Sequence, residues 1–148
     1  MPDRRGPAYG NRFTVEVQGQ ELQGVRKVEI PSRTTETGEY REGDEPDYEK
    51  KLLGDTTFGT LTIERSIQPD DSTVFDWAEL GRMGDVDGAR KECEVTLEDE
   101  EGSPEITWRF ENAWVQHYDP PTLDVDSEDP IGEMAVIAFD KMVREYID

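Results

Sequence analysis

Apolar and polar residues alternate with a period of two in five separate segments, and this alternation constrains the fold more than any other feature of the sequence. In residues 12–18, for example, Phe13, Val15 and Val17 share one phase, and mostly polar residues occupy the other. Successive side chains of a β-strand point to opposite faces, so this pattern predicts strands with one buried face. The other four segments are residues 23–37, 56–67, 90–98 and 105–117.

A sixth strand is predicted over residues 133–146, with a different pattern. Its start, residues 134–139, is apolar in both phases. A strand that is apolar on both faces is expected to be covered on both, by the domain's own helix or by a neighbouring subunit.

One helix is predicted, over about residues 72–82. Val74, Trp77 and Ala78 form an apolar stripe at helical spacing. Ser72 is the expected N-cap, and Gly84 is expected to end the helix. The residues therefore predict a mainly β fold of about six antiparallel strands and one helix.

Residues 38–55 interrupt the strand pattern. They are highly charged, contain Gly43, Pro46 and Gly54, and show no stable period. A connection this long is unusual in a compact domain, and long loops are usually functional or disordered. Since it lies between two strand-like segments, we expect it to form an extended hairpin or arm.

The charge of the chain excludes several classes of function. Its 148 residues, one domain's worth, hold 16 Lys and Arg against 36 Asp and Glu, a net charge of −20. Nucleic-acid binding through a basic footprint and docking on an anionic membrane are both excluded as main roles. A host whose cytoplasm holds molar salt would select such a surface, and an acidic surface for a cationic partner is the alternative.

The residues offer little catalytic chemistry. The chain has one histidine, His117, expected at a strand end, and one cysteine, Cys93, in the inward phase of its strand. Neither predicts a nucleophilic triad, and one cysteine excludes an intrachain disulfide. Residues 124–128 carry alternating carboxylates but lack the central glycine and last glutamate of a calcium loop. We therefore predict no enzyme, no catalytic or metal-binding residue and no cofactor.

The first ten residues predict a flexible arm before the folded domain. Residues 1–10 contain Pro2, Gly6, Pro7 and Gly10 and are expected to form a flexible arm before a single domain at residues 11–148. No apolar run follows the first residues, which predicts a protein without a signal peptide that is made in the cytoplasm.

Six short motifs, in order, resemble the tail-tube protein family of contractile phages and contractile injection systems, whose type VI secretion relatives share the fold. The most specific is the Trp-x-Phe-x-Asn-Ala-Trp pattern of residues 108–114. The other five are the strand at residues 12–19, Tyr-Arg-Glu-Gly at residues 40–43, the segments at residues 51–54 with 58–65, Phe-Asp-Trp at residues 75–77, and Pro-x-Leu-Asp at residues 121–124.

The resemblance covers about residues 11–146 and implies a fold and a function. The fold would be two packed antiparallel sheets forming a β-barrel-like sandwich, with one flanking helix and a long extended arm. Rings of six copies would stack into a hollow tube, which sheath contraction drives through a target envelope. The implied partners are further copies of the chain, a sheath protein, baseplate or hub proteins, a tube terminator, and cargo or DNA passing through the lumen.

The resemblance also assigns roles to residues. Those expected in the arm, contacting neighbouring subunits or the next ring, are Tyr40, Arg41, Glu42, Asp44, Tyr48, Lys50, Lys51 and Leu52. Those expected to pack in the wall or core are Phe13, Trp77, Trp108, Phe110, Trp114, Val136 and Phe139. The particle would be a virion tail or an extracellular injection particle, and the expected host is a halophilic archaeon.

Two alternatives remain open at this point. One is a tube initiator at the baseplate, a paralogue within the same family. The other belongs to a different class: an acidic monomeric binding module or enzyme of a halophile, which predicts a concave site holding an acid with a perturbed pKa.

Overall fold

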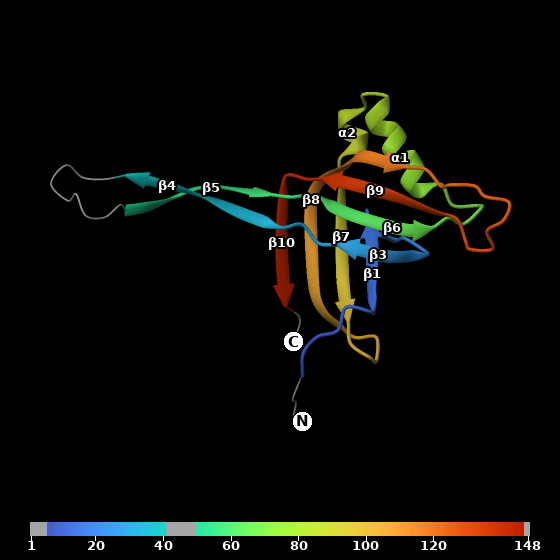
Figure 1. The fold of residues 1–148 in the computed structure, drawn as a ribbon, viewed down its shortest axis with the longest axis horizontal. Helices are drawn as coiled ribbons and strands as arrows, with labels where there is room; N and C mark the ends of the chain where they lie inside the picture. Colours follow the sequence, from blue (N-terminus) through green and yellow to red (C-terminus); the bar gives the residue numbers. More distant parts are fainter. Residues whose placement is uncertain (1–5, 41–49, 147–148) are drawn as a thin grey trace.

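Strands dominate the structure, as the alternating pattern predicts (Figure 1). The computed structural model describes residues 6–40 and 50–146. Its elements are β1 (Phe13–Val17), β2 (Gln20–Glu21), β3 (Val25–Glu29), β4 (Arg33–Tyr40), β5 (Lys50–Phe58), β6 (Leu61–Ser66), α1 (Thr73–Arg82), α2 (Val86–Ala89), β7 (Lys91–Glu98), β8 (Pro104–Asp119), β9 (Gly132–Ala138) and β10 (Lys141–Tyr146).

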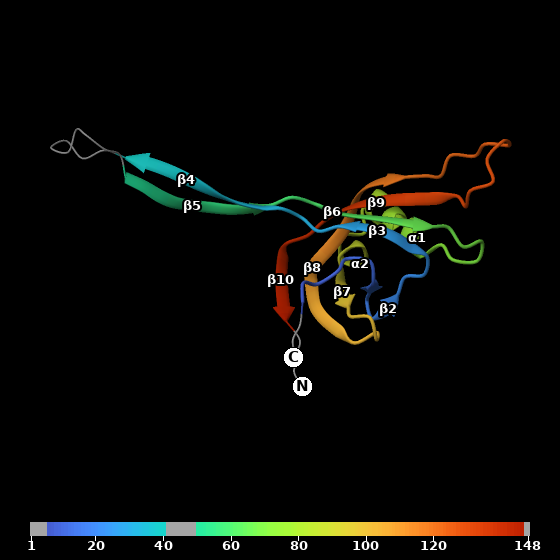
Figure 2. The same cartoon turned by 60° about the horizontal axis from the view of Figure 1, so that its bottom comes forward.

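Two antiparallel sheets share one long strand. The first sheet has the order β2-β1-β7-β8-β10, and the second has the order β8-β9-β6-β3. The first half of β8 pairs with β7 and β10, and its second half pairs with β9. Figures 1 and 2 show the strands of the two sheets crossing steeply, with β8 running from one into the other. The path ends at β2 and β3, so the expected two-sheet sandwich is confirmed, but it does not close into a barrel.

The hydrophobic core lies between the inner faces of the two sheets. The first sheet contributes the inward phases of β1 and β7, such as Val15 and Val95, and the second contributes Leu61 and Ile137. Phe110 of β8 is fully buried and lies edge-on to Phe139, with their ring centroids 5.0 Å apart. This core confirms that alternation predicts which faces of the strands are buried.

Two predicted strands prove too long. Between β3 and β6 the chain leaves the two sheets to form the separate hairpin of β4 and β5, and it returns next to the point where it left. Residues 23–37 divide into β3 and β4 around Pro31, and residues 56–67 divide into β5 and β6 around Gly59. Pro31 has no amide hydrogen to continue a ladder. The Gly59 amide donates to the Ser32 carbonyl oxygen at 2.8 Å, which holds the two breaks side by side. Residues 32–37 hold no apolar side chain, and Phe58 lies in the opposite phase from Leu61 and Ile63, so the alternation changes at both breaks.

The predicted last strand also divides in two. At Phe139 and Asp140 the chain passes from β9, in the second sheet, to β10, in the first. Within β9, Ala135 and Ile137 are buried on the core side, whereas Met134 is half-buried on the opposite face. Within the described chain one face of β9 is fully covered and the other is half-covered, and cover of that second face by a neighbouring subunit stays a prediction.

The helix prediction is confirmed over Thr73–Arg82, and Ser72 is the N-cap residue as expected, although its side chain makes no capping hydrogen bond. The Ser72 hydroxyl donates to Asp76 instead. Asp71 takes the capping role, since its Oδ1 accepts from the backbone nitrogen of Thr73 at 3.0 Å. Gly84, with φ +79°, follows the end of the helix as expected. The four-residue helix α2 was not predicted.

Trp77 attaches α1 to the body. Its side chain is buried, and its Nε1 donates to the Ala89 carbonyl oxygen of α2 at 2.7 Å. Removing this donor leaves a buried acceptor unpaired and also leaves a cavity, and both changes destabilise the folded chain.

We expect Trp77→Phe to lower the free energy of unfolding by about 2–4 kcal/mol. Urea denaturation of the unassembled chain measures this change. Met83→Leu is the matched control, because Met83 lies at the end of the same helix and is 62% exposed. Equal stabilities of the two variants would contradict the anchoring role of Trp77.

Candidate assembly interface

A hairpin of β4 and β5 projects from the body (Figures 1 and 2). We call residues 33–40 and 50–58 the arm. The arm forms a two-stranded sheet of its own, separate from the two sheets of the body. Leu53 is 92% exposed and Leu52 is 49% exposed. An isolated two-stranded hairpin is marginally stable in water, so a second surface must cover the arm for it to hold one shape.

A bulge at Gly54 shapes the arm. Thr35 pairs with Thr56 and Thr37 pairs with Leu53, so Gly54 and Asp55 of β5 oppose Glu36 alone. A Cβ at Gly54 would lie 3.0 Å from both the Cβ and the carbonyl oxygen of Glu36. The close approach of the two strands therefore favours glycine at this position.

The expected arm residues fall partly outside the described chain. Tyr40 ends β4, and Lys50, Lys51 and Leu52 begin β5. The others, Arg41, Glu42, Asp44 and Tyr48, lie outside the described residues. Leu53, the most exposed leucine of the arm, directly follows Leu52 but was not among the predicted arm residues.

The first sheet has an unpaired strand on each side. β10 pairs with β8, and no described strand pairs with its other edge. On the far side of the sheet, β2 covers only Glu16 and Val17 of β1. Exposed edges of this kind are templates for pairing with another chain.

The outer face of the first sheet is acidic. Arg109 of β8 lies at the centre of this face, 3.2 Å from Glu94, 3.5 Å from Glu92 and 3.0 Å from Glu145. The hydrogen bonds from Arg109 to Glu94 and Glu145 raise the pKa of its guanidinium. These pairs connect β7, β8 and β10 across the sheet.

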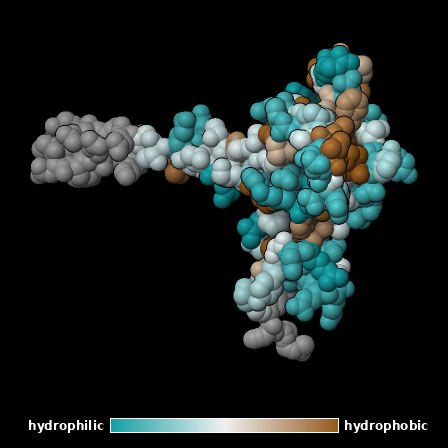
Figure 3. All heavy atoms as spheres, turned by 45° about the vertical axis from the view of Figure 1, so that its right-hand side comes forward, coloured by the Kyte–Doolittle hydropathy of each residue, from teal (hydrophilic) through white to brown (hydrophobic). Residues whose placement is uncertain are grey.

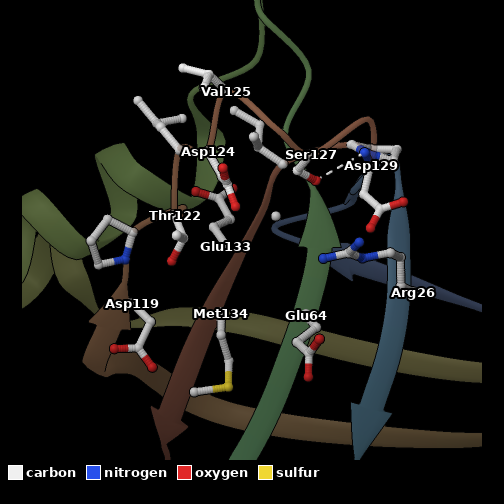
Figure 4. A pocket seen from close by; sticks show the side chains of 15 residues that line it. Arg26, Glu64, Asp119, Thr122, Asp124, Val125, Ser127, Asp129, Glu133 and Met134 are labelled. Carbon is white, nitrogen blue, oxygen red and sulfur yellow. Dashed lines mark hydrogen bonds between the residues drawn. The ribbon is translucent and has the colours of Figure 1, made fainter.

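A pocket lies where the loop of residues 120–131 folds over one end of the second sheet (Figure 4). Its volume is about 580 Å³. Leu123, Val125 and Ile131 of the loop line it, together with Met134 of β9, and all three loop residues are exposed. Figure 3 shows hydrophobic atoms gathered on the body away from the arm, on an otherwise hydrophilic surface. The sequence analysis missed this pocket because the loop has no regular period.

The charged groups beside α1 are structural. Arg65 is 1% exposed, and its Nη2 donates to Asp71 at 2.6 Å. Glu133 lies 3.6 Å from Arg65 Nη1 and accepts a hydrogen bond from the Tyr118 hydroxyl. Hydrogen bonds from Thr73 and Arg65 lower the pKa of Asp71 to about 2. An acid held ionised in this way caps a helix and does not supply a proton near neutral pH.

The structure places the residues expected in the wall or core as follows. Trp77 and Phe110 are buried in the core, and Phe13, Trp108 and Phe139 pack against it. Trp114 is half-buried, with the Arg90 guanidinium 5.3 Å from its ring centroid. Val136 is half-buried on the face of β9 opposite the core, where it pairs with Thr62 and His117.

The groups considered for catalysis lie apart. His117 is exposed, with Nε2 2.9 Å from Asp119 Oδ1. Cys93 is fully buried, and burial raises the pKa of its thiol to about 12. In the described ranges, no group of three or more His, Cys, Asp or Glu side chains is placed to hold a metal ion. None of the helices in these ranges is long and apolar enough to span a membrane.

Comparison with known proteins identifies relatives of the whole chain. The family described as T4-like virus tail tube protein gp19 matches residues 10–143. A comparison with curated protein sequences finds no match.

Three solved structures illustrate the similarity in fold. A chain of the sheath–tube complex of the extracellular contractile injection system PVC is 22% identical with a TM-score of 0.83, covering 95% of this chain and 93% of that one. A chain of the anti-feeding prophage tube-terminating cap is 18% identical with a TM-score of 0.84, covering 99% and 96%. Hcp1 from Flavobacterium johnsoniae is 20% identical with a TM-score of 0.61, covering 90% and 94%.

The role of Asp71 predicts a pH dependence. Its pKa falls from 3.8 to about 2 on folding, so the ionised carboxylate stabilises the fold above about pH 4. This stabilisation, about 2 kcal/mol, is lost as the pH falls through about 2. We therefore expect Asp71→Asn to be less stable than wild type at pH 6 and nearly equal to it at pH 2. Urea denaturation at both pH values measures the difference, and Asp70→Asn, at the exposed neighbouring residue, is the control.

The bulge predicts a difference between two glycines of the arm. Gly54→Ala places a methyl group against the Glu36 backbone, whereas at Gly38 the nearest atom to an added Cβ is Leu52 Cβ at 3.8 Å, an ordinary contact. Gly54→Ala should therefore lose amide protection in β4 and β5, while Gly38→Ala keeps it. Hydrogen exchange measures this protection. Equal protection in both variants would show that the bulge tolerates a side chain.

Proposed function

The chain belongs to the family of T4-like virus tail tube proteins, and from this premise we propose that six copies close into a ring and that rings stack into a hollow inner tube. Contraction of a surrounding sheath would drive this tube through a target envelope. The family match over residues 10–143 carries the proposal, since it covers nearly all of the described chain.

The two open edges of the first sheet support ring formation. They belong to different strands, β10 and β1, on opposite sides of the sheet. Pairing β10 of one copy with β1 of the next is a head-to-tail contact, and such contacts close into rings when the rotation between copies fits. Repeated around a ring, this pairing joins the first sheets of all copies into one continuous wall.

The acidic face of the first sheet fits the inner surface of that wall. The second sheet packs on the other side of the first sheet, where Val74 and Trp77 of α1 join the shared core, so that side of each subunit would face outward. The carboxylates around Arg109, from Glu92, Glu94 and Glu145, then face the bore. Cargo or DNA in the lumen would meet a surface dominated by negative charge.

The net charge fits a host with molar salt in its cytoplasm. A ring of six copies carries six times the charge of −20, and the repulsion opposes both ring closure and stacking. At about 1 M salt the Debye length falls to about 3 Å, which screens this repulsion. We propose a halophilic archaeal host, assembly in the cytoplasm, and a place in a virion tail or an extracellular particle.

The remaining partners follow from similar structures. The relatives whose structures match come from a sheath–tube complex, a tube-terminating cap and a baseplate. Sheath, terminator and baseplate or hub proteins are therefore the proposed partners of this tube. Its role is structural, and the proposal includes no enzymatic step and no cofactor.

Electron microscopy of the purified protein at about 2 M and about 0.1 M salt tests the proposal. We expect hollow tubes or rings at high salt and fewer after dialysis to low salt, and native mass spectrometry should give six copies in the ring. Monomers at both concentrations, even with baseplate components added, would contradict the proposed function. Equal assembly at both would contradict only the argument from charge.

A further inference from the structure

The two open edges of the first sheet each carry a cation and an acid at matching positions. On the β1 edge these are Arg12, which directly precedes the strand, and Glu16. The ladder with β7 extends to Arg12, whose carbonyl oxygen accepts from the Glu98 amide at 2.8 Å. On the β10 edge the charged residues are Lys141 and Glu145. The two edges therefore carry the same order of charge along the chain, with the cation first and the acid at the fourth residue after it.

These charged side chains share the outer face of the first sheet, the face of Arg109. Val15 is buried in the core, so the alternate positions 12 and 16 point away from the core. Positions 141 and 145 pair with positions 111 and 107 of β8, which have the phase of Arg109. A copy of the chain at either edge therefore meets these charges on one face.

The directions of the strands make the two edges complementary. β1, β7, β8 and β10 are each antiparallel to the next, so β1 and β10, at the two sides of the first sheet in Figure 1, run in opposite directions. Rotation about the axis of a ring keeps the direction of each strand along that axis. β10 of one copy is therefore antiparallel to β1 of the next. Since both strands have the cation first, each cation lies at the end where the other strand has its acid.

The acid at the β1 edge is one of a like-charged pair. Glu21 of β2 lies directly opposite Glu16, so both carboxylates belong to the outer face, and we call these two residues the acid pair. Neither forms an ion pair with a described residue. Like charges directly opposite each other destabilise two paired strands, and a cation beside them offsets this cost. The folded chain therefore presents a position for a cation at this edge.

β2 also limits where β10 of another copy can pair. It covers the edge of β1 from Val15 onward, since the Val15 carbonyl oxygen accepts from the Leu22 amide at 2.8 Å. The open part of this edge is residues 12–14, at the start of β1. A β10 strand that pairs there ends beside β2, and its residue at that end is Lys141, the first of the strand. The lysine is thus brought next to the acid pair.

We infer that Lys141 of each subunit docks against the acid pair of the next subunit in the ring, and that Glu145 faces that subunit's Arg12. These contacts set the register between copies, because a slip of four residues would set Lys141 against Arg12 or Glu145 against Glu16. The inference rests on the proposed ring. It goes further by naming the side chains that decide how the two edges meet.

Charge reversal at Lys141 tests the contact. Lys141→Glu sets a third carboxylate beside the acid pair, so we expect rings to require a protein concentration about tenfold or more above that of wild type. Native mass spectrometry, at the lowest salt concentration at which the wild-type chain forms rings, measures the fraction in rings. Lys27→Glu is the control and should assemble as wild type, because it makes the same change at an exposed residue of β3, in the second sheet.

Mixing two defective chains gives a sharper test. A chain with both Glu16→Lys and Glu21→Lys should also fail to close, because Lys141 then meets two further cations. When this chain is mixed with Lys141→Glu, every contact in an alternating ring joins unlike charges. We expect rings that hold equal numbers of the two chains, which mass spectrometry resolves when one chain is isotopically labelled. Such rescue also shows that both chains fold.

The outcomes separate the inference from the proposed function. Lys141→Glu chains that form rings as readily as wild type overturn the contact while the ring itself stands. A mixture that gives no alternating rings also overturns it, and so does an equal loss of rings in Lys27→Glu, which would assign the effect to net charge. A wild-type chain that forms no rings or tubes under any condition overturns both.

Discussion

The bend in β8 is the feature on which the rest of the structure depends. A single strand of 16 residues pairs in the first sheet with its first half and in the second sheet with its second half. Asn112 makes the turn, with φ +53°, a left-handed conformation that asparagine adopts more readily than most residues. Its side-chain amide donates to Asp140 at 3.0 Å, at the corner where the chain passes from β9 to β10. The hydrogen bond therefore joins the two points at which the chain passes between the sheets, the bend within β8 and the corner between β9 and β10. The inner faces of the two sheets then enclose one core.

The buried charges beside α1 impose a second constraint. Arg65 occupies an inward position on β6 that a hydrophobic residue would otherwise fill, so its charge must be compensated inside the protein. Asp71 and Glu133 supply that compensation from two different parts of the chain. The same Asp71 caps α1 and so fixes where the helix begins. In a chain with a net charge of −20, one buried cation thus positions the helix, and the acidic groups elsewhere remain on the surface.

Local sequence patterns predicted the strands and the helix well. They predicted poorly the features that depend on contacts between distant parts of the chain, such as the Arg65–Glu133 pair and the pocket. Alternation identified the buried faces of β1, β6 and β7 because each face packs against one core. The alternation changes at Pro31 and at Gly59, but it could not show that the chain leaves the two sheets there to form a separate hairpin. Arg65 is a polar residue in the apolar phase of Leu61 and Ile63, but no local pattern connects it to Glu133, its partner far along the chain. The pocket was not predicted for the same reason. Residues 119–134 form a pocket only together with Arg26 and Glu64, which lie beside them because β6 pairs with β9.

The arm explains why the folded monomer is incomplete. Two of its seven cross-strand pairs join threonines, including the Thr35–Thr56 hydroxyl pair at 2.9 Å, and its leucines face solvent. Two strands with so little buried apolar surface do not offset the conformational entropy lost on ordering them. The body also has uncovered surface: an open edge on each side of the first sheet and, at the end away from the arm, a pocket lined by both apolar side chains and carboxylates. The unpaired edges and the exposed leucines of the arm are surfaces that further copies of the chain can cover, as the proposed tube requires. On that proposal, the free energy that orders the arm is gained on assembly and not on folding.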